Sequence, residues 1–129
     1  MAYWEFLLQK EGDRDWLPLE TAHVEISEGR YRIIAHTSYC KIPVEIRLGQ
    51  LLADQIPPRR KTLRRIGQTN ENGLMVVMPF THLTAGSWTI KCSAIEPDGA
   101  AVPQDVWEYG VQLQVLAIES DLDYWDTDL

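Results

Sequence analysis

The sequence lacks many of the features that mark specialised classes of protein. It has only two cysteines among 129 residues and no Cys-x-x-Cys pair, so neither redox nor zinc chemistry is indicated. No apolar run approaches the ~20 residues that a membrane-spanning helix requires. The N-terminal residues have neither a basic start nor a small-residue cleavage site, so no secretion signal is expected. These absences predict a cytoplasmic protein without a membrane span, in which Cys40 and Cys92 are free thiols.

Catalytic and metal-binding signatures are also missing. The three histidines, His23, His36 and His82, lie in separate segments, and none has a second ligand at i+2 or i+4 with a supporting third. The sequence contains no nucleophile elbow, no phosphate-binding glycine loop and no His-Glu-x-x-His motif. Its paired carboxylates lie in polar turn clusters, where acids hydrogen-bond to the nearby backbone and to solvent. We therefore expect no metal, no cofactor and no enzymatic activity.

What the sequence does contain is a series of short segments in which apolar and polar residues alternate. In the clearest, residues 42–48, isoleucine, valine and leucine alternate with proline, glutamate and arginine. A period of two is typical of a strand with one face in a core. Further strands are expected at 3–9, 16–19, 24–26, 30–37 and 107–118. Pro18 favours an edge position for the second of these, and residues 51–53 allow a helical turn.

The strongest pattern lies in residues 73–92 and predicts two strands joined by a tight corner. Leu74 to Met78 is continuously apolar, which favours a strand buried on both faces, or nearly so. Proline cannot donate to a β-ladder, so Pro79 is expected to end this strand. Gly86 supplies the turn, since glycine adopts positive φ without steric cost.

The second strand of this stretch begins at an aromatic residue. Trp88, Ile90 and Cys92 alternate with polar residues, so all three are expected to point into a core. Their expected neighbours there are Val44 and Ile46. On this basis Trp88→Ala should cost about 3–5 kcal/mol of stability, the usual range for a buried large aromatic.

The segments together amount to seven or eight strands at the spacing of about 8–12 residues that sandwiches show, with no helix longer than a turn or two. We predict an all-β fold, an antiparallel two-sheet sandwich, over residues 1–118. A closed barrel is the structural alternative, because alternation does not say whether the last strand pairs with the first. Residues 119–129 hold five acids and no base, and are expected to be an acidic tail or the start of a linker.

The corner between the two strands of residues 73–92 carries a family resemblance. Leu83, then Ala85 and Gly86, then Trp88 at the start of an alternating strand is similar to the corner between the fifth and sixth strands of immunoglobulin-like and fibronectin-type-III-like sandwiches. In those families the aromatic residue is usually a tyrosine whose hydroxyl bonds back to the corner, whereas Trp88 offers an indole N–H. As a whole the chain also resembles uncharacterised immunoglobulin-like domains at the N-termini of larger bacterial, in particular cyanobacterial, proteins. The resemblance implies an immunoglobulin-like sandwich of seven to eight strands within a longer protein.

One segment is strongly basic although the chain has a net charge of −7. Its five cations are Arg59, Arg60, Lys61, Arg64 and Arg65. Nucleic-acid binding would need a positive field and interleaved aromatic residues, and this segment contains no aromatic while the rest of the chain is acidic. We expect an edge strand or loop whose cations discourage edge-to-edge association or contact an acidic protein partner, including the remainder of the parent chain or residues 119–129.

Five tryptophans raise an alternative function, because sandwich modules that bind carbohydrate stack sugars on exposed aromatic rings. Trp16 and Trp125 lie in irregular segments and are the candidates for exposure. Two isolated indoles are weak support for such a site. We therefore predict a non-enzymatic interaction or spacer module, the N-terminal domain of a longer protein, with a carbohydrate-binding module as the alternative.

Overall fold

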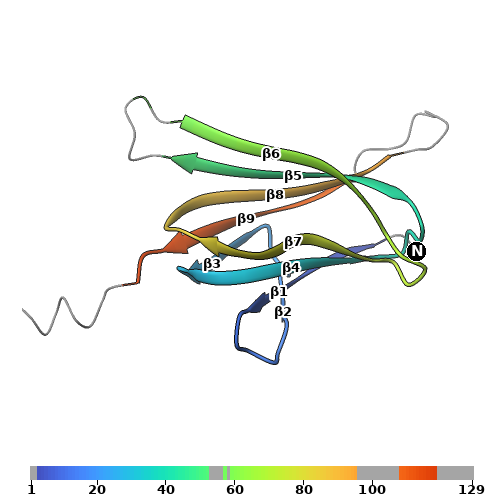
Figure 1. The fold of residues 1–129 in the computed structure, drawn as a ribbon, viewed down its shortest axis with the longest axis horizontal. Coiled ribbons are helices and arrows are strands. Elements are labelled where there is room, and N and C mark those ends of the chain that lie inside the picture. The colour runs from blue at the N-terminus through green and yellow to red at the C-terminus, as the bar shows by residue number, and fades with distance from the viewer. Residues whose placement is uncertain (1–2, 53–56, 58, 96–107, 119–129) are drawn as a thin grey trace, which may run out of the picture.

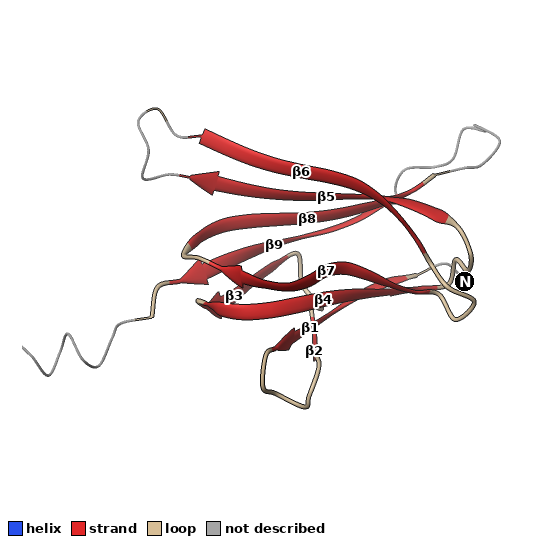
Figure 2. Ribbon diagram, in the orientation of Figure 1, coloured by secondary structure: helices blue, strands red, loops and turns tan. Residues whose placement is uncertain are grey.

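The computed structural model describes residues 3–52, 57, 59–95 and 108–118, and all the regular secondary structure in them is β-strand. The strands form two sheets packed face to face (Figures 1 and 2). The smaller sheet has the strand order β2-β1-β4-β7 and consists of β1 (Trp4–Lys10), β2 (Leu17–Pro18), β4 (Gly29–Thr37) and β7 (Leu74–Leu83). The larger sheet has the order β3-β9-β8-β5-β6 and consists of β3 (His23–Ser27), β5 (Pro43–Leu52), β6 (Arg59–Gln68), β8 (Gly86–Ala94) and β9 (Glu108–Leu116).

The predicted all-β, two-sheet sandwich is confirmed, with two differences in detail. The described residues form nine strands rather than seven or eight, because residues 59–68, for which an edge strand or a loop was expected, form strand β6 in addition to the other eight segments. The pairing is antiparallel except between β3 and β9, which run parallel. A closed barrel is not observed in this part of the chain, since the first strands and the last lie in two sheets with separate edges.

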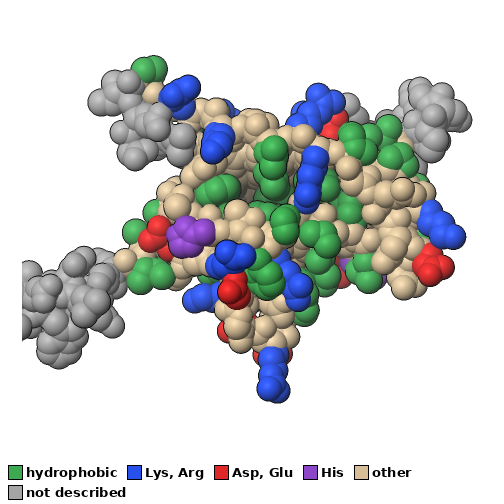
Figure 3. All heavy atoms as spheres, viewed as in Figure 1, with side chains coloured by type: hydrophobic (Ala, Val, Ile, Leu, Met, Phe, Trp, Pro, Cys, Tyr) green, Lys and Arg blue, Asp and Glu red, His purple; other side chains and the backbone are tan. Residues whose placement is uncertain are grey.

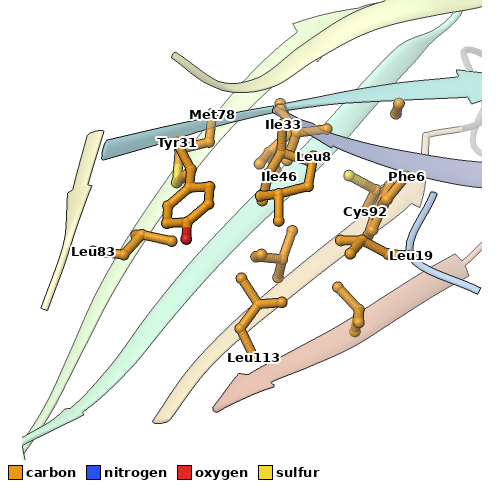
Figure 4. Close-up of a cluster of buried hydrophobic side chains, with 14 of the residues drawn as sticks. Phe6, Leu8, Leu19, Tyr31, Ile33, Ile46, Met78, Leu83, Cys92 and Leu113 are labelled. Atoms are coloured by element: carbon orange, nitrogen blue, oxygen red, sulfur yellow. The ribbon is translucent and has the colours of Figure 1, made fainter. Parts of the chain in front are cut away.

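The core lies between the inner faces of the two sheets, as the alternation in the sequence predicts. Along β4, every second residue from Tyr31 to Ala35 is buried, and in β5 Val44 and Ile46 are buried. Figure 4 shows the apolar side chains of both sheets pointing toward one another, among them Phe6 and Leu113. Burial of this common apolar surface fixes which face of each strand points inward.

Strand β7 departs from the prediction, because it does not end at Pro79 but continues to Leu83. The strand is the edge of the smaller sheet, so a proline can be accommodated without loss of a ladder bond. Two register shifts against β4 disturb the alternation here, and Val77 and Met78 are consecutive buried residues. Val76 is 54% exposed, so the expectation of a strand buried on both faces is wrong.

The sequence allows a helical turn at residues 51–53. Leu51 and Leu52, the two of these residues that the structure describes, form strand instead. Leu51 and Leu52 complete strand β5, where they lie opposite Arg60 and Arg59 of β6. Leu51 also pairs with Ser87 of β8. Ladder pairing to strands on both sides outweighs the local preference of a short apolar run.

The turn between β6 and β7 depends on Gly73. Its φ angle is +75°, and a Cβ atom built there would lie 2.0 Å from the carbonyl oxygen of Thr37. The side chain of Asn70 holds the turn, since its Oδ1 accepts hydrogen bonds from the N–H groups of Asn72 at 2.8 Å and Leu74 at 2.9 Å. The turn at residues 70–73 therefore requires glycine for both backbone angle and space.

We expect Gly73→Ala to lower the free energy of unfolding by about 3 kcal/mol or more, because it adds a clash with backbone to the cost of the left-handed angle. Gly12→Ala is the matched control. Gly12 also has positive φ, +95°, but a methyl group added there would meet nothing within 4 Å. This control should cost about 1–2 kcal/mol from the backbone angle alone. Urea denaturation followed by tryptophan fluorescence measures both, and equal losses would contradict the close approach to Thr37.

Candidate functional site

The two sheets have four edges, and three of them are blunted. Strand β2 has two residues, β3 has five, and β7 contains Pro79 and two register shifts. Strand β6 is different: it has ten residues, no proline, and an uninterrupted register with β5 from Gln68 to Arg59. Short length, proline and bulges are the usual means of protecting an edge. Within the described residues, β6 is therefore the long edge that has none of these three forms of protection.

All five cations of the predicted basic segment lie on β6, so of the two structures expected for it, the edge strand is the one formed. Residues opposite each other in an antiparallel pair share a face. Lys61, Leu63 and Arg65 lie on the inner face, opposite Gln50, Leu48 and Ile46, whereas Arg60 and Arg64 lie on the outer face. Leu63 is 58% exposed although it faces inward. Around Leu63, the inner face of β6 is thus not covered by the smaller sheet.

On the outer face, the carboxylate of Glu45 holds two arginines. Arg47 Nε donates to its Oε1 at 2.5 Å, and an Arg64 guanidinium nitrogen donates to its Oε2 at 2.5 Å. Burial would raise the pKa of Glu45, but the hydrogen bonds from Arg64 and Arg47 outweigh it and lower the pKa. The cations at 59–61 make no hydrogen bond or ion pair with another described residue. They remain free to meet an external charge.

Arg65 spans the space between the two sheets. Its guanidinium donates to the carbonyl oxygen of Val77 at 2.5 Å and lies 3.4 Å from that of Val76. Both acceptors belong to β7, the facing edge of the smaller sheet. Its Nε is buried without a partner among the described residues. Arg65 therefore links edge strands β6 and β7 by hydrogen bonds and is not a free surface cation.

The two cysteines are free, as predicted, with Cys40 exposed and Cys92 buried. Burial raises the pKa of the Cys92 thiol to about 12, against an opposing effect of the nearby Arg65. The thiol is therefore neutral at physiological pH. A neutral buried thiol behaves as a small apolar side chain and not as a nucleophile.

Beside Arg65, edge strands β6 and β7 of the two sheets diverge and leave a groove between them. The turn at 69–73 joins β6 to β7, and the two strands diverge from it into different sheets (Figure 1). The groove has a volume of about 320 Å³. Its walls are mainly apolar and include Leu48, Leu63, Met78, Pro79 and Trp88. Two cations, Lys61 and Arg65, lie at its rim. Figure 3 shows hydrophobic side chains gathered on this face with lysine and arginine side chains around them.

Trp88 forms a wall of this groove and packs against the margin of the core. The alternation predicts full burial beside Val44 and Ile46, and this is wrong for Trp88. It is half-buried and lies opposite Gln50, near the end of the sandwich where β6 and β7 are apart. Its indole N–H donates to the carbonyl oxygen of Thr84 at 2.9 Å. This hydrogen bond links the aromatic residue to the corner between β7 and β8. The expected burial is correct for Ile90 and Cys92.

The aromatic candidates do not form an exposed platform in the described residues. Trp16 is half-buried, and the guanidinium carbon of Arg32 lies 4.7 Å from its ring centroid. The same carbon lies 4.8 Å from the ring centroid of Phe80. Arg32 thus contacts both rings by cation–π interactions. Trp125 lies outside the described residues.

Other kinds of site find little support in the part of the chain that the structure describes. Its histidines, cysteines and acids form no group of three that could hold a metal ion. Nor does it contain a helix with the length and hydrophobicity needed to cross a membrane. The fold and the groove define the described part of the chain as an all-β sandwich with a long open edge at β6. Neither the comparison with protein-family models nor that with curated proteins finds a match for the chain.

Because part of its ring is already exposed, Trp88→Ala should cost about 2–3 kcal/mol, less than the loss expected for a core tryptophan. Trp88→Phe keeps most of the ring packing but removes the N–H donor to Thr84, so about 1 kcal/mol should be lost. Denaturant melts of both variants measure the difference. A loss below about 0.5 kcal/mol for Trp88→Ala, the range of ordinary surface substitutions, would mean that the ring does not support the groove.

Proposed function

We propose that the chain is a non-enzymatic interaction module whose docking surface is the open edge β6, and that it forms the N-terminal domain of a longer protein. The observation that carries this proposal is the state of β6. It is the long, continuous edge of the larger sheet, it bears unpaired cations at 59–61, and it exposes Leu63 and Ile66 by 58% and 59%. Cations alone would serve to keep other strands away. Apolar residues exposed beside them favour a specific partner instead.

The immunoglobulin-like class is part of the proposal, and the strand order supports it. Strands β1, β4 and β7 lie in one sheet, while β9, β8, β5 and β6 lie in the other. Immunoglobulin-like domains with an added fourth strand on the second sheet distribute their strands in the same way. The bond from Trp88 to Thr84 gives the corner a link of the kind that tyrosine makes in that class.

The partner that suits β6 is an extended acidic segment of a protein. Such a segment can add to the edge as a further strand, with its backbone paired to the free N–H and C=O groups of β6. Alternate side chains of an added strand face opposite sides of the sheet. Acids on it would meet Arg60 on the outer face and Lys61 on the inner face, and an apolar residue would cover Leu63.

The other candidates have weaker support. A nucleic acid would meet cations confined to one strand of a molecule with a net charge of −7. A carbohydrate would need an exposed ring, and Trp16 is covered in part by Arg32. A hollow of about 340 Å³ on the outer face of the larger sheet, around Gly49, has polar and cationic walls with no aromatic side chain among its described lining residues.

The proposal is tested with a synthetic glutamate–leucine peptide in which pairs of glutamates, one for each face of the sheet, alternate with pairs of leucines. It is titrated into isotopically labelled protein and followed by NMR. We expect shifts concentrated along β6 that fade as salt rises past ~0.15 M, because exposed ion pairs are screened. Arg60→Glu combined with Lys61→Glu should weaken binding by about fivefold or more, given about 0.2–1 kcal/mol for each exposed pair. Both residues lack partners among the described residues, so the fold should persist.

The matched control for that variant is Arg14→Glu, a charge reversal of an exposed residue in the loop before β2. It should bind the peptide as the unchanged protein does. Non-specific duplex DNA should show no binding at physiological salt. Equal peptide binding by the β6 variant, or DNA binding that this variant abolishes, would refute the proposal.

A further inference from the structure

We propose that residues 119–129 of the same chain lie along the groove between β6 and β7 in the free protein, with apolar side chains in it, so that a partner must displace them. This inference deepens the proposed function, and its biological meaning rests on it. Three observations carry it: the place where the described chain ends, the chemistry of the groove, and the composition of the segment.

The described chain ends beside the groove. The carboxylate of Glu28 accepts a hydrogen bond from the N–H of Ala85 at 3.3 Å and another from the N–H of Ile118 at 3.4 Å. Since one carboxylate joins them, Ile118 and the corner at Ala85 are neighbours. The chain therefore leaves β9 next to the corner between β7 and β8.

That corner is also the end of the groove. Thr84, which precedes Ala85, accepts the indole N–H of Trp88 with its carbonyl oxygen and the side-chain amide of Gln50 with its hydroxyl, at 2.9 and 3.0 Å. Trp88 and Gln50 are both lining residues of the groove. A chain that passes Thr84 from Ile118 thus enters the groove without crossing the larger sheet.

The composition of the segment matches the groove. Residues 119–129 contain five acids and no base. Apolar side chains alternate with several of these acids, at Leu122, Tyr124 and Leu129, and Trp125 is adjacent to one. The groove offers apolar walls for such side chains, and Lys61 at its rim has no partner among the described residues. Residues 119–129 thus combine acidic and apolar side chains, as does the partner proposed for β6.

The length of the segment is also sufficient. Eleven extended residues span about 36 Å, and a ten-residue strand such as β6 is about 33 Å long. A segment tethered beside the groove has a high effective concentration there, so even weak contacts would keep it in place. It would occupy the space into which an added strand must extend. The acidic partner would then compete with the chain's own acids.

The test uses paramagnetic relaxation in the full chain. A nitroxide is attached at Thr127→Cys in a Cys40→Ser background, where the buried, neutral thiol of Cys92 does not react. We expect strong, selective broadening of the NMR signals of Leu63 and Met78 in the groove. Broadening should decrease as salt rises toward ~0.5 M. It should also decrease with Lys61→Glu and persist with the matched Arg14→Glu.

Two further samples decide between the alternatives. Mixing nitroxide-labelled chains that carry no isotope with isotope-labelled chains that carry no nitroxide should give no broadening, because the contact is within one chain. Broadening in this mixture, or none at the groove in the first sample, overturns the inference. In the full chain with Asp121, Asp123, Asp126 and Asp128 changed to asparagine, the glutamate–leucine peptide should bind about fivefold or more tightly than in the unchanged chain, since competition is removed.

The peptide also separates the two proposals. If groove broadening is absent and the peptide still binds β6, this inference fails and the proposed function stands. If broadening is present but the peptide does not bind even the four-asparagine chain, the proposed function fails and the contact within the chain stands.

Discussion

The constraint on which this structure depends is that two sheets must bury one face each against the other. Side chains such as Phe6, Ile33 and Ile46 are 0–1% exposed, and their burial sets the register of every strand that carries them. The same constraint weakens where the sheets diverge. Strands β6 and β7 are consecutive in the chain but belong to different sheets, so they meet at their turn and part beyond it (Figure 1). The open side of the molecule follows from its connectivity.

Arg65 shows how this open side is stabilised. Its guanidinium bonds to carbonyl oxygens of β7, which as an edge strand has backbone groups without a ladder partner. A cation that bonds to these carbonyls joins the two edges without a further strand. The groove then remains on one side of Arg65, with Trp88 and Leu63 as walls. The proposed docking surface is thus a consequence of how the sandwich is closed.

Much of the fold could be predicted because alternation reports burial directly. It succeeded for residues 42–48, whose strand lies inside a sheet and has one face in the core. It failed at Pro79, because the effect of a proline depends on whether its strand is an edge, and pairing partners are not visible in one sequence. It also misplaced Trp88, since alternation gives the face of a strand but not how far the opposite sheet extends along it.

The candidate site was predicted in part. Charge alone drew attention to residues 59–65, and the edge strand there was one of the two structures expected. The tie made by Arg65 and the groove beside Trp88 were missed, because both depend on β7 lying across from β6 in the other sheet. No local pattern carries that information. A basic run that also contains a leucine and an isoleucine, here Leu63 and Ile66, is the signal that could have suggested an edge with a partner.

The central claim, that β6 is an edge with free backbone groups, is tested most directly by amide hydrogen exchange measured residue by residue with NMR. In an antiparallel edge strand, successive N–H groups point alternately toward the neighbouring strand and away from it. The account predicts alternating slow and fast exchange along β6, from Arg60 to Gly67, and uniformly slow exchange along β5, which is paired on both sides. Uniformly slow exchange along β6 would contradict the account, because it would mean that a further strand already covers the edge.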